Sequence, residues 1–161
     1  GLLSIALRGY HRVDLHVTEV LPLTIAARTG THRFYNIFTY SPAVDSSGRW
    51  GFGYGSGTEV GYRGRHRGNI EWFAEHVNEQ VEWIDAINIV GRISFTYGYV
   101  IKRRLIISAG PSLNVLFTDW RDAETGAYRS GIAPYTLFEE AQDALLVRGW
   151  VGGRLAVGVY F

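Results

Sequence analysis

The end of the chain alternates strictly between two kinds of side chain, from Leu155 to Phe161. In a β-strand successive side chains point to opposite faces. One face of this segment therefore carries only large apolar side chains, those of Leu155, Val157, Val159 and Phe161. The other face carries small, polar or amphipathic ones, those of Arg154, Ala156, Gly158 and Tyr160. The pattern predicts a final β-strand with one face in an apolar environment and the other in a different, more polar one.

The same period of two runs through three longer segments, which are residues 50–62, 87–99 and 105–117. No segment shows the 3.6-residue period of an amphipathic helix. Each segment has a length of twelve steps. At about 3.3 Å per step and a tilt of about 40–45°, such a strand rises roughly 28–30 Å, against about 25 Å for the apolar band of a membrane barrel. The strand lengths therefore fit a transmembrane β-barrel.

The closing strand, apolar on one face and ending on Phe161, resembles the closing strand of bacterial outer-membrane barrels. In that family the terminal aromatic strand is recognised by the machinery that inserts barrels into the outer membrane. Segments 109–115 and 133–137 are similar to stretches of uncharacterised barrel domains in the outer membranes of Bacteroidota. The resemblance implies the outer membrane of a Gram-negative bacterium, a periplasmic C-terminus, contact with outer-membrane lipid and lipopolysaccharide, and contact with other envelope proteins. It supplies no catalytic motif.

The connections between the alternating segments are expected to lie at opposite ends of a barrel, in turn. Counting back from the C-terminus, outer connections fall at 119–143, 80–84 and 41–48, and periplasmic ones at 102–104, 63–68 and 28–30. Within 119–143, segment 133–140 is expected to cap the barrel mouth or form a short helix. Residues 1–27 are expected to hold two strands with an outer connection near Tyr10–Asp14, and the closing strand to begin near Ala144. We therefore predict an all-β fold, an antiparallel up-and-down transmembrane barrel of eight strands.

Composition limits the remaining possibilities. The formal net charge of +1 argues against a nucleic-acid partner, and the absence of cysteine excludes disulfides and thiolate metal sites. The chain has no methionine and opens directly on a strand-like segment. We expect residues 1–161 to form one barrel domain, either after removal of a signal peptide or, the favoured alternative, as the C-terminal piece of a longer protein.

A soluble, lipocalin-like barrel would show the same alternation with its faces inverted. Two observations favour the membrane barrel. The non-apolar faces consist mainly of glycine, serine, threonine and asparagine, which fill a narrow interior well and make a poor solvated surface. Segment 105–118 carries no charge at all, and Lys102 is the single lysine, whereas soluble edge strands are usually protected by charge.

Six charged residues fall on the small-residue faces and are expected to form a polar network in the lumen: Glu59, Glu71, Glu75, Arg92, Arg148 and Arg154. Isolated charges are costly in a low-dielectric lumen, so these should pair and fill the barrel, with a polar track for ions as the alternative. Six aromatic residues are expected at the membrane interfaces: Trp50, Tyr62, Tyr97, Tyr99, Phe117 and Phe161. The run 63–67 is either a solvated turn, the simpler interpretation, or a site for anionic headgroups.

One short segment allows an enzymatic interpretation. Outer-membrane lipid A deacylases are small barrels that use a His-x-Ser pair and an acidic residue, and this chain has His76-Val77-Asn78. Asparagine cannot replace the nucleophilic serine. His11, His16, His32 and His66 lack the spacing of metal ligands. We therefore expect no catalytic, cofactor or metal site and a non-enzymatic anchoring, structural or complex-subunit role, with a lipid A-modifying enzyme or a narrow pore as alternatives.

Overall fold

The computed structural model describes residues 10–17, 21, 23–31, 33–44, 46, 48–81, 84–119, 135–142 and 145–161. These residues form nine strands and contain no helix that could span a membrane. The strands are β1 (Tyr10–Val17), β2 (Thr24–Gly30), β3 (Phe34–Ser41), β4 (Trp50–Arg63), β5 (His66–Val81), β6 (Ile84–Ile101), β7 (Leu105–Asp119), β8 (Phe138–Gln142) and β9 (Leu145–Tyr160).

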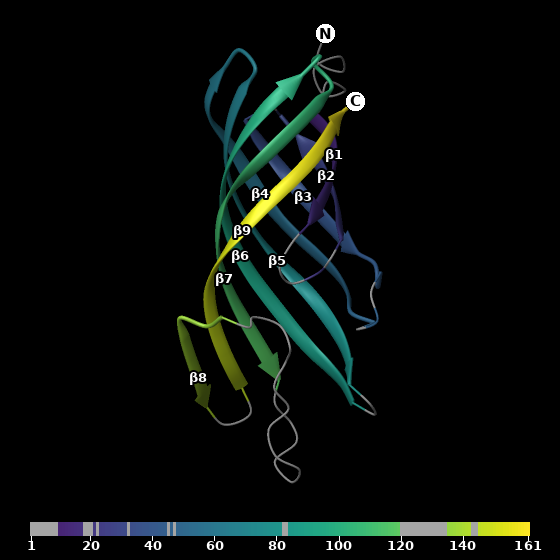
Figure 1. Cartoon of the computed structure of the whole chain (residues 1–161), viewed down its shortest axis with the longest axis vertical. Helices are drawn as coiled ribbons and strands as arrows, with labels where there is room; N and C mark the ends of the chain where they lie inside the picture. Colours follow the sequence, from purple (N-terminus) through teal and green to yellow (C-terminus); the bar gives the residue numbers. More distant parts are fainter. Residues whose placement is uncertain are drawn as a thin grey trace.

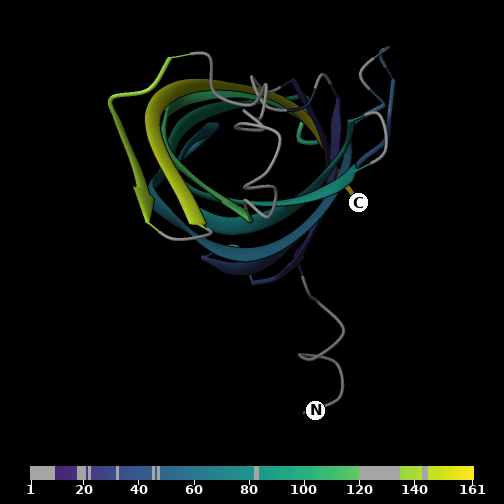
Figure 2. The same cartoon turned by 90° about the horizontal axis from the view of Figure 1, so that it is seen from below.

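Eight of the strands close into an antiparallel barrel. Strands β1 to β7 pair in chain order, β9 pairs with β7, and β9 then closes the ring by pairing with β1. Figure 1 shows β9 crossing the front of the barrel, and Figure 2 shows the closed ring along its axis. The predicted eight-stranded, up-and-down, antiparallel barrel is confirmed, and its closing strand begins one residue after the expected Ala144.

Strand β8 lies outside the ring (Figure 2). Among the described strands it pairs only with the first part of β9, where Phe138 faces Gly149 and Gln142 faces Leu145. The same part of β9 also pairs with β7. The expectation of a short helix over 133–140 is therefore wrong for its described part, because residues from Phe138 onward form a strand on the free edge of β9.

The barrel wall is uneven in height. Strands β1, β2 and β3 have 8, 7 and 8 residues, whereas β4 to β7 and β9 have 14 to 18. The three segments of twelve steps lie within β4, β6 and β7. Since about 9–11 tilted residues cross the hydrocarbon of a bilayer, the five long strands exceed that length and the first three fall short of it.

The expected connection near Tyr10–Asp14 is wrong, because this segment forms β1. Arg12 and Asp14 are buried in the barrel, whereas Val13 and Leu15 are exposed on its outside. The connection was placed by counting back from the C-terminus, and the partners Glu71 and Arg28 that accommodate Arg12 and Asp14 in the lumen lie far away along the chain. Residues 1–9, which were expected to hold the first strand, lie outside the described part.

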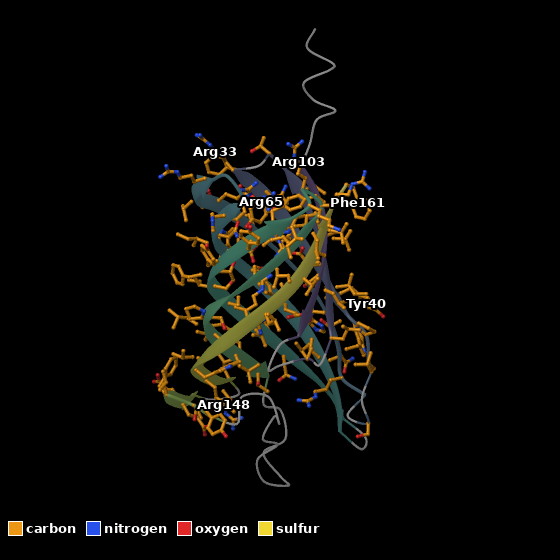
Figure 3. All side chains as sticks on the ribbon, turned by 45° about the horizontal axis from the view of Figure 1, so that its top comes forward. Arg33, Tyr40, Arg65, Arg103, Arg148 and Phe161 are labelled. Atoms are coloured by element: carbon orange, nitrogen blue, oxygen red, sulfur yellow. The ribbon has the colours of Figure 1, made fainter. Side chains whose placement is uncertain are left out.

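The two ends of the barrel differ. At one end, called here the short-turn end, tight turns join β2 to β3, β4 to β5 and β6 to β7. In Figure 3, Arg33, Arg65 and Arg103 from these three turns lie at the same end as Phe161. The opposite end, called here the long-loop end, holds the longer β1–β2, β3–β4 and β7–β8 connections together with the short β5–β6 connection.

Candidate functional site

The centre of the lumen is organised around the carboxylate of Glu71 on β5. Arg28 on β2 donates from Nε to Oε1 over 3.0 Å and from Nη2 to Oε2 over 3.2 Å. Arg154 on β9 also pairs with Oε2, and Nη2 of Arg12 on β1 lies 3.6 Å from Oε1. All four side chains are buried. One carboxylate therefore contacts guanidinium groups from three strands, none of which is adjacent to β5 in the sheet.

Asp14 and Tyr35 extend this arrangement, called here the central network. Asp14 accepts a hydrogen bond of 3.0 Å from Nε of Arg12 and also pairs with Arg28. The Tyr35 hydroxyl donates to Oε1 of Glu71 over 2.8 Å, and its ring lies 5.8 Å from the Arg28 guanidinium carbon. Buried charges are tolerated when they are paired and hydrogen-bonded. Each charged group of the central network has an oppositely charged partner, and the network joins β1, β2, β3, β5 and β9.

The network forms because inward-facing positions on separate strands reach the same level of the barrel. Arg12 and Asp14 alternate with outward Val13 and Leu15, and Arg28 follows outward Ala27. Sequence reasoning missed these three charged residues, since two were assigned to a connection and Arg28 to a turn. The detectable signal was the alternation of charged and apolar residues over 12–15.

A second polar group lies beyond the central network, toward the long-loop end. Glu75 accepts a 2.9 Å hydrogen bond from the Ser41 hydroxyl, which in turn lies 2.7 Å from the Thr24 hydroxyl. Arg92 donates from Nε to Oδ1 of Asn114 over 2.7 Å, and its guanidinium carbon lies 5.3 Å from the centre of the Phe73 ring. Glu75 and Arg92 therefore occupy the lumen beside Glu71 and Arg154.

The other two expected lumen residues lie near the ends. Glu59, buried toward the short-turn end, has its Oε2 3.9 Å from Nε of Arg67. Arg148 is buried near the long-loop end, where its Nε donates to Oε2 of Glu139 over 2.9 Å. Because Glu139 belongs to β8, this pair joins β9 to the strand outside the ring (Figure 3).

Apolar side chains fill part of the same interior. On the long-loop side of Glu75 a buried cluster, called here the apolar layer, consists of Leu21, Val77, Val90, Leu116 and Trp150. Nearer the central network, Ala26, Tyr35 and Ile37 form a second buried cluster, against which Tyr160 packs. An eight-stranded barrel is just wide enough for its side chains to fill. In the described part of the chain, the lumen thus contains one layer of ion-paired side chains and one layer of apolar side chains.

The outer surface is apolar. At intermediate heights the exposed fractions of Trp72, Leu113 and Leu155 are 55%, 52% and 52%. A groove of about 610 Å³ with almost wholly apolar walls crosses β5, β6 and β7, where Ala74 and Gly91 leave room beside Trp72. The barrel therefore has a charged interior and an apolar exterior, the reverse of a lipocalin-like barrel.

Exposed aromatic side chains lie toward both ends. Trp50 and Phe117 lie outside toward the long-loop end, and Tyr97, Tyr99 and Phe161 toward the short-turn end. The side chain of Tyr62, on β4, lies outside the described part. Sequence reasoning missed exposed Phe34 and Tyr40 on β3, although Phe34, Phe38 and Tyr40 alternate with buried residues there.

His76 faces outward, in contact with aromatic rings. Its ring stacks on Phe52 at a centroid distance of 5.1 Å and lies 6.3 Å from Trp50. Its Nδ1 has no hydrogen-bond partner in the described part of the chain. Asn78 follows two residues later and faces Trp50 across the β4–β5 pair. The described side chains therefore provide no histidine–carboxylate pair of the kind that activates a nucleophile.

Among the described residues, no group of three or more histidine, aspartate or glutamate side chains is arranged to hold a metal ion. The side chains of His11 and His16, and residue His32, lie outside the described part. No family model, curated protein or solved structure matches this chain. The functional proposal therefore depends on the geometry.

Proposed function

We propose that this chain is an integral β-barrel of the outer membrane of a Gram-negative bacterium, with a filled lumen and a non-enzymatic anchoring, structural or complex-subunit role. The observation that carries the proposal is the partition of side chains in the barrel wall. Outward positions are apolar and exposed, and inward positions hold the buried charges. In water, the apolar outer face of such a barrel would be exposed to solvent. In a bilayer, the same face would contact hydrocarbon.

The energetic argument concerns the size of the apolar surface. Burial of apolar surface stabilises by about 25 cal/mol per Å², and soluble monomers rarely expose contiguous apolar patches beyond a few hundred Å². Here exposed apolar side chains occur on every strand of the ring, from Leu15 on β1 to Leu155 on β9. Acyl chains would cover this belt, including the groove beside Gly91.

The lengths of the connections support one orientation of the barrel in the membrane. Membrane barrels of this kind have short turns on the periplasmic side and longer outer loops. The short-turn end would then be periplasmic, with Phe161 exposed there for the insertion machinery. The long-loop end would face lipopolysaccharide.

Two alternatives, a narrow pore and a lipid A-modifying enzyme, have less support. A pore needs a continuous polar path, whereas Val77, Leu116 and Trp150 of the apolar layer are buried across the lumen. Planar-bilayer recordings are expected to show no single-channel steps. An enzyme of the deacylase type needs a nucleophile beside His76, where Asn78 stands. Lipid A mass spectra are expected to stay unchanged on overexpression.

A subunit role is favoured by the surroundings of β8. Tyr135, Leu137 and Phe138 are exposed there, beside a strand that pairs with β9 on one edge only among the described residues. Tyrosine and phenylalanine are common in protein interfaces. Among the described residues of the long-loop end, this region is the best suited to contact another envelope protein.

Depth-dependent fluorescence quenching tests the membrane proposal. Two single-tryptophan variants, one keeping outward Trp72 and the other inward Trp150, are refolded into vesicles whose lipids carry bromine deep in the acyl chains. Trp72 should be strongly quenched and Trp150 weakly, because only the former faces the hydrocarbon. Equal, weak quenching of both variants, or release of the protein from membranes by a carbonate wash, would overturn the proposal.

A further inference from the structure

Cationic side chains are concentrated in the three tight turns of the short-turn end. All six are exposed, and Figure 3 shows three of them, Arg33, Arg65 and Arg103, at this end. We call the six residues the basic rim: Arg33, Arg63, Arg65, Lys102, Arg103 and Arg104.

Acidic side chains do not compensate the basic rim. In the described part of the chain, none of its six residues forms an ion pair with an acidic side chain. Glu59, the described acid nearest along the adjoining strands, is buried in the lumen with Arg67. Exposed Glu139 and Glu140 lie on β8, toward the opposite end. Among the described residues, the exposed side chains of the short-turn end therefore produce a positive local potential.

The β4–β5 turn and the β6–β7 turn lie side by side, next to exposed aromatic side chains. The amide of Val100 donates to the carbonyl of Arg65 over 2.8 Å, which ties the β4–β5 turn to the end of β6. Nη1 of Arg65 lies 3.5 Å from the Tyr99 hydroxyl, and His66 contacts the Tyr97 hydroxyl. Guanidinium and phenol groups are suitable donors for a phosphate oxygen. One cation of the basic rim, Arg65, and the neighbouring His66 therefore adjoin tyrosine hydroxyls on the outer face.

The backbone of the β6–β7 turn gives a second, independent indication. Lys102 and Arg103 have φ values of 50° and 63°, in the left-handed region that asparagine and glycine adopt most easily. The β4–β5 turn uses Gly64 at a φ of 56°. Two long cationic side chains thus occupy positions where Asn-Gly would suit the backbone better. Strain of this kind is retained where the side chains themselves have a role.

We propose that the basic rim binds the phosphate groups of anionic phospholipids, such as phosphatidylglycerol, in the leaflet at the short-turn end. This inference rests on the proposed membrane function and names the lipid class at one interface. A soluble acidic partner is less well supported, because the cations are distributed over three turns and border outward Tyr97, Tyr99 and Phe161. Basic groups beside aromatic ones at a membrane surface face the headgroups.

The test measures lipid selectivity at the surface of the inserted barrel. The protein is refolded into phosphatidylcholine vesicles, and the relative association of spin-labelled phosphatidylglycerol and phosphatidylcholine is measured by electron paramagnetic resonance. The wild type should prefer phosphatidylglycerol. Removing one cation should lower this preference by up to about fivefold, the factor expected for one cation near an anionic surface. Salt should weaken the preference by screening.

The informative variant is Lys102→Asn/Arg103→Gly, because its turn suits the left-handed backbone and the barrel should fold at least as well as the wild type. Its preference for phosphatidylglycerol should fall, as should that of Arg65→Gln. Ala43→Asp/Ser46→Asp changes the net charge equally in the exposed β3–β4 connection and should leave the preference unchanged.

The outcomes separate the two proposals. A barrel that inserts but shows equal association with both lipids overturns the basic-rim inference and leaves the membrane proposal standing. A preference that survives in Lys102→Asn/Arg103→Gly and Arg65→Gln also overturns it, as does an equal loss in Ala43→Asp/Ser46→Asp. Failure of the wild type to insert overturns the membrane proposal itself.

Discussion

Arg28 on β2 and Glu71 on β5 join two strands that are not neighbours in the sheet. Their side chains form two hydrogen bonds of 3.0 and 3.2 Å across the lumen, between residues 43 positions apart in the chain. Both are about 1% exposed. Water solvates neither the guanidinium of Arg28 nor the carboxylate of Glu71. Each charge is therefore stabilised by the other and by the surrounding polar partners.

Removal of the Glu71 charge should destabilise the barrel strongly. Glu71→Gln leaves the guanidinium groups of Arg12, Arg28 and Arg154 facing one another with Asp14 as the remaining acid of the central network. Breaking a buried ion pair typically costs roughly 3–5 kcal/mol. Urea unfolding of the vesicle-inserted barrel measures the loss. Glu140→Gln on exposed β8 should change stability by less than about 0.5 kcal/mol; equal effects of the two substitutions would contradict the structural role of the network.

The pair between Glu139 and Arg148 should contribute far less than the central network. Its donor–acceptor distance is 2.9 Å, but the Glu139 side chain is 42% exposed. Arg148 is only 6% exposed, but the carboxylate of the pair is in contact with solvent, which brings its contribution near the value of about 0–1 kcal/mol for exposed ion pairs. Glu139→Gln should therefore cost under ~1 kcal/mol in the same unfolding measurement. A cost as large as that of Glu71→Gln would show that β8 contributes to the stability of the ring.

Two glycines on neighbouring strands should respond oppositely to alanine. A Cβ on Gly110 would collide with the Phe95 carbonyl and lie 2.8 Å from Cα of Thr96, whereas a Cβ on Gly153 would meet no atom within 4 Å. Gly110→Ala should thus cost roughly 1–3 kcal/mol by overpacking. Gly153→Ala should be neutral or stabilising by up to about 1 kcal/mol, because alanine loses less backbone entropy. Thermal unfolding of both variants checks the difference, and similar shifts would refute it.

A charge on the outer surface should destabilise the barrel according to its depth. Ile93 faces outward midway along β6, whereas Phe34 faces outward at the start of β3, near the short-turn end. In a bilayer, Ile93→Arg should cost about 2–4 kcal/mol and Phe34→Arg about 0–1 kcal/mol. The folded fraction in vesicles, scored by the gel mobility of unheated samples, measures both. Equal, small effects would indicate that water and not hydrocarbon surrounds Ile93.

Prediction from the sequence succeeded where local geometry decides the outcome. The alternation over 87–99 and 155–161 indicated which side chains share a face, and the structure places Ile93, Leu155 and Val157 outside and Arg92 and Arg154 inside. This works because the direction of a side chain in a strand depends only on the backbone of its own strand. The turns predicted at 63–68 and 102–104 fall where the structure joins β4 to β5 and β6 to β7. The turn predicted at 28–30 is wrong, because these residues belong to β2 and the connection to β3 follows them.

Prediction was wrong in the N-terminal part, where an outer connection was expected near Tyr10–Asp14 and the structure has a strand. Arg12 and Asp14 lie in β1, and their burial is tolerated because Arg28 and Glu71 complete their pairing. Similarly, nothing near Phe138 indicates a strand until β9 provides an edge for it. Both features depend on segments distant in sequence.

The amino-acid sequence by itself determined the strands after residue 50, their apolar and polar faces, and the antiparallel barrel that such strands build. Only the tertiary structure decided which lumen charges meet. Arg154 reaches Glu71 across 83 positions of chain, and that contact exists because closure of β9 against β1 sets the register of the whole ring. Register is a property of strand pairs, so no single segment encodes it.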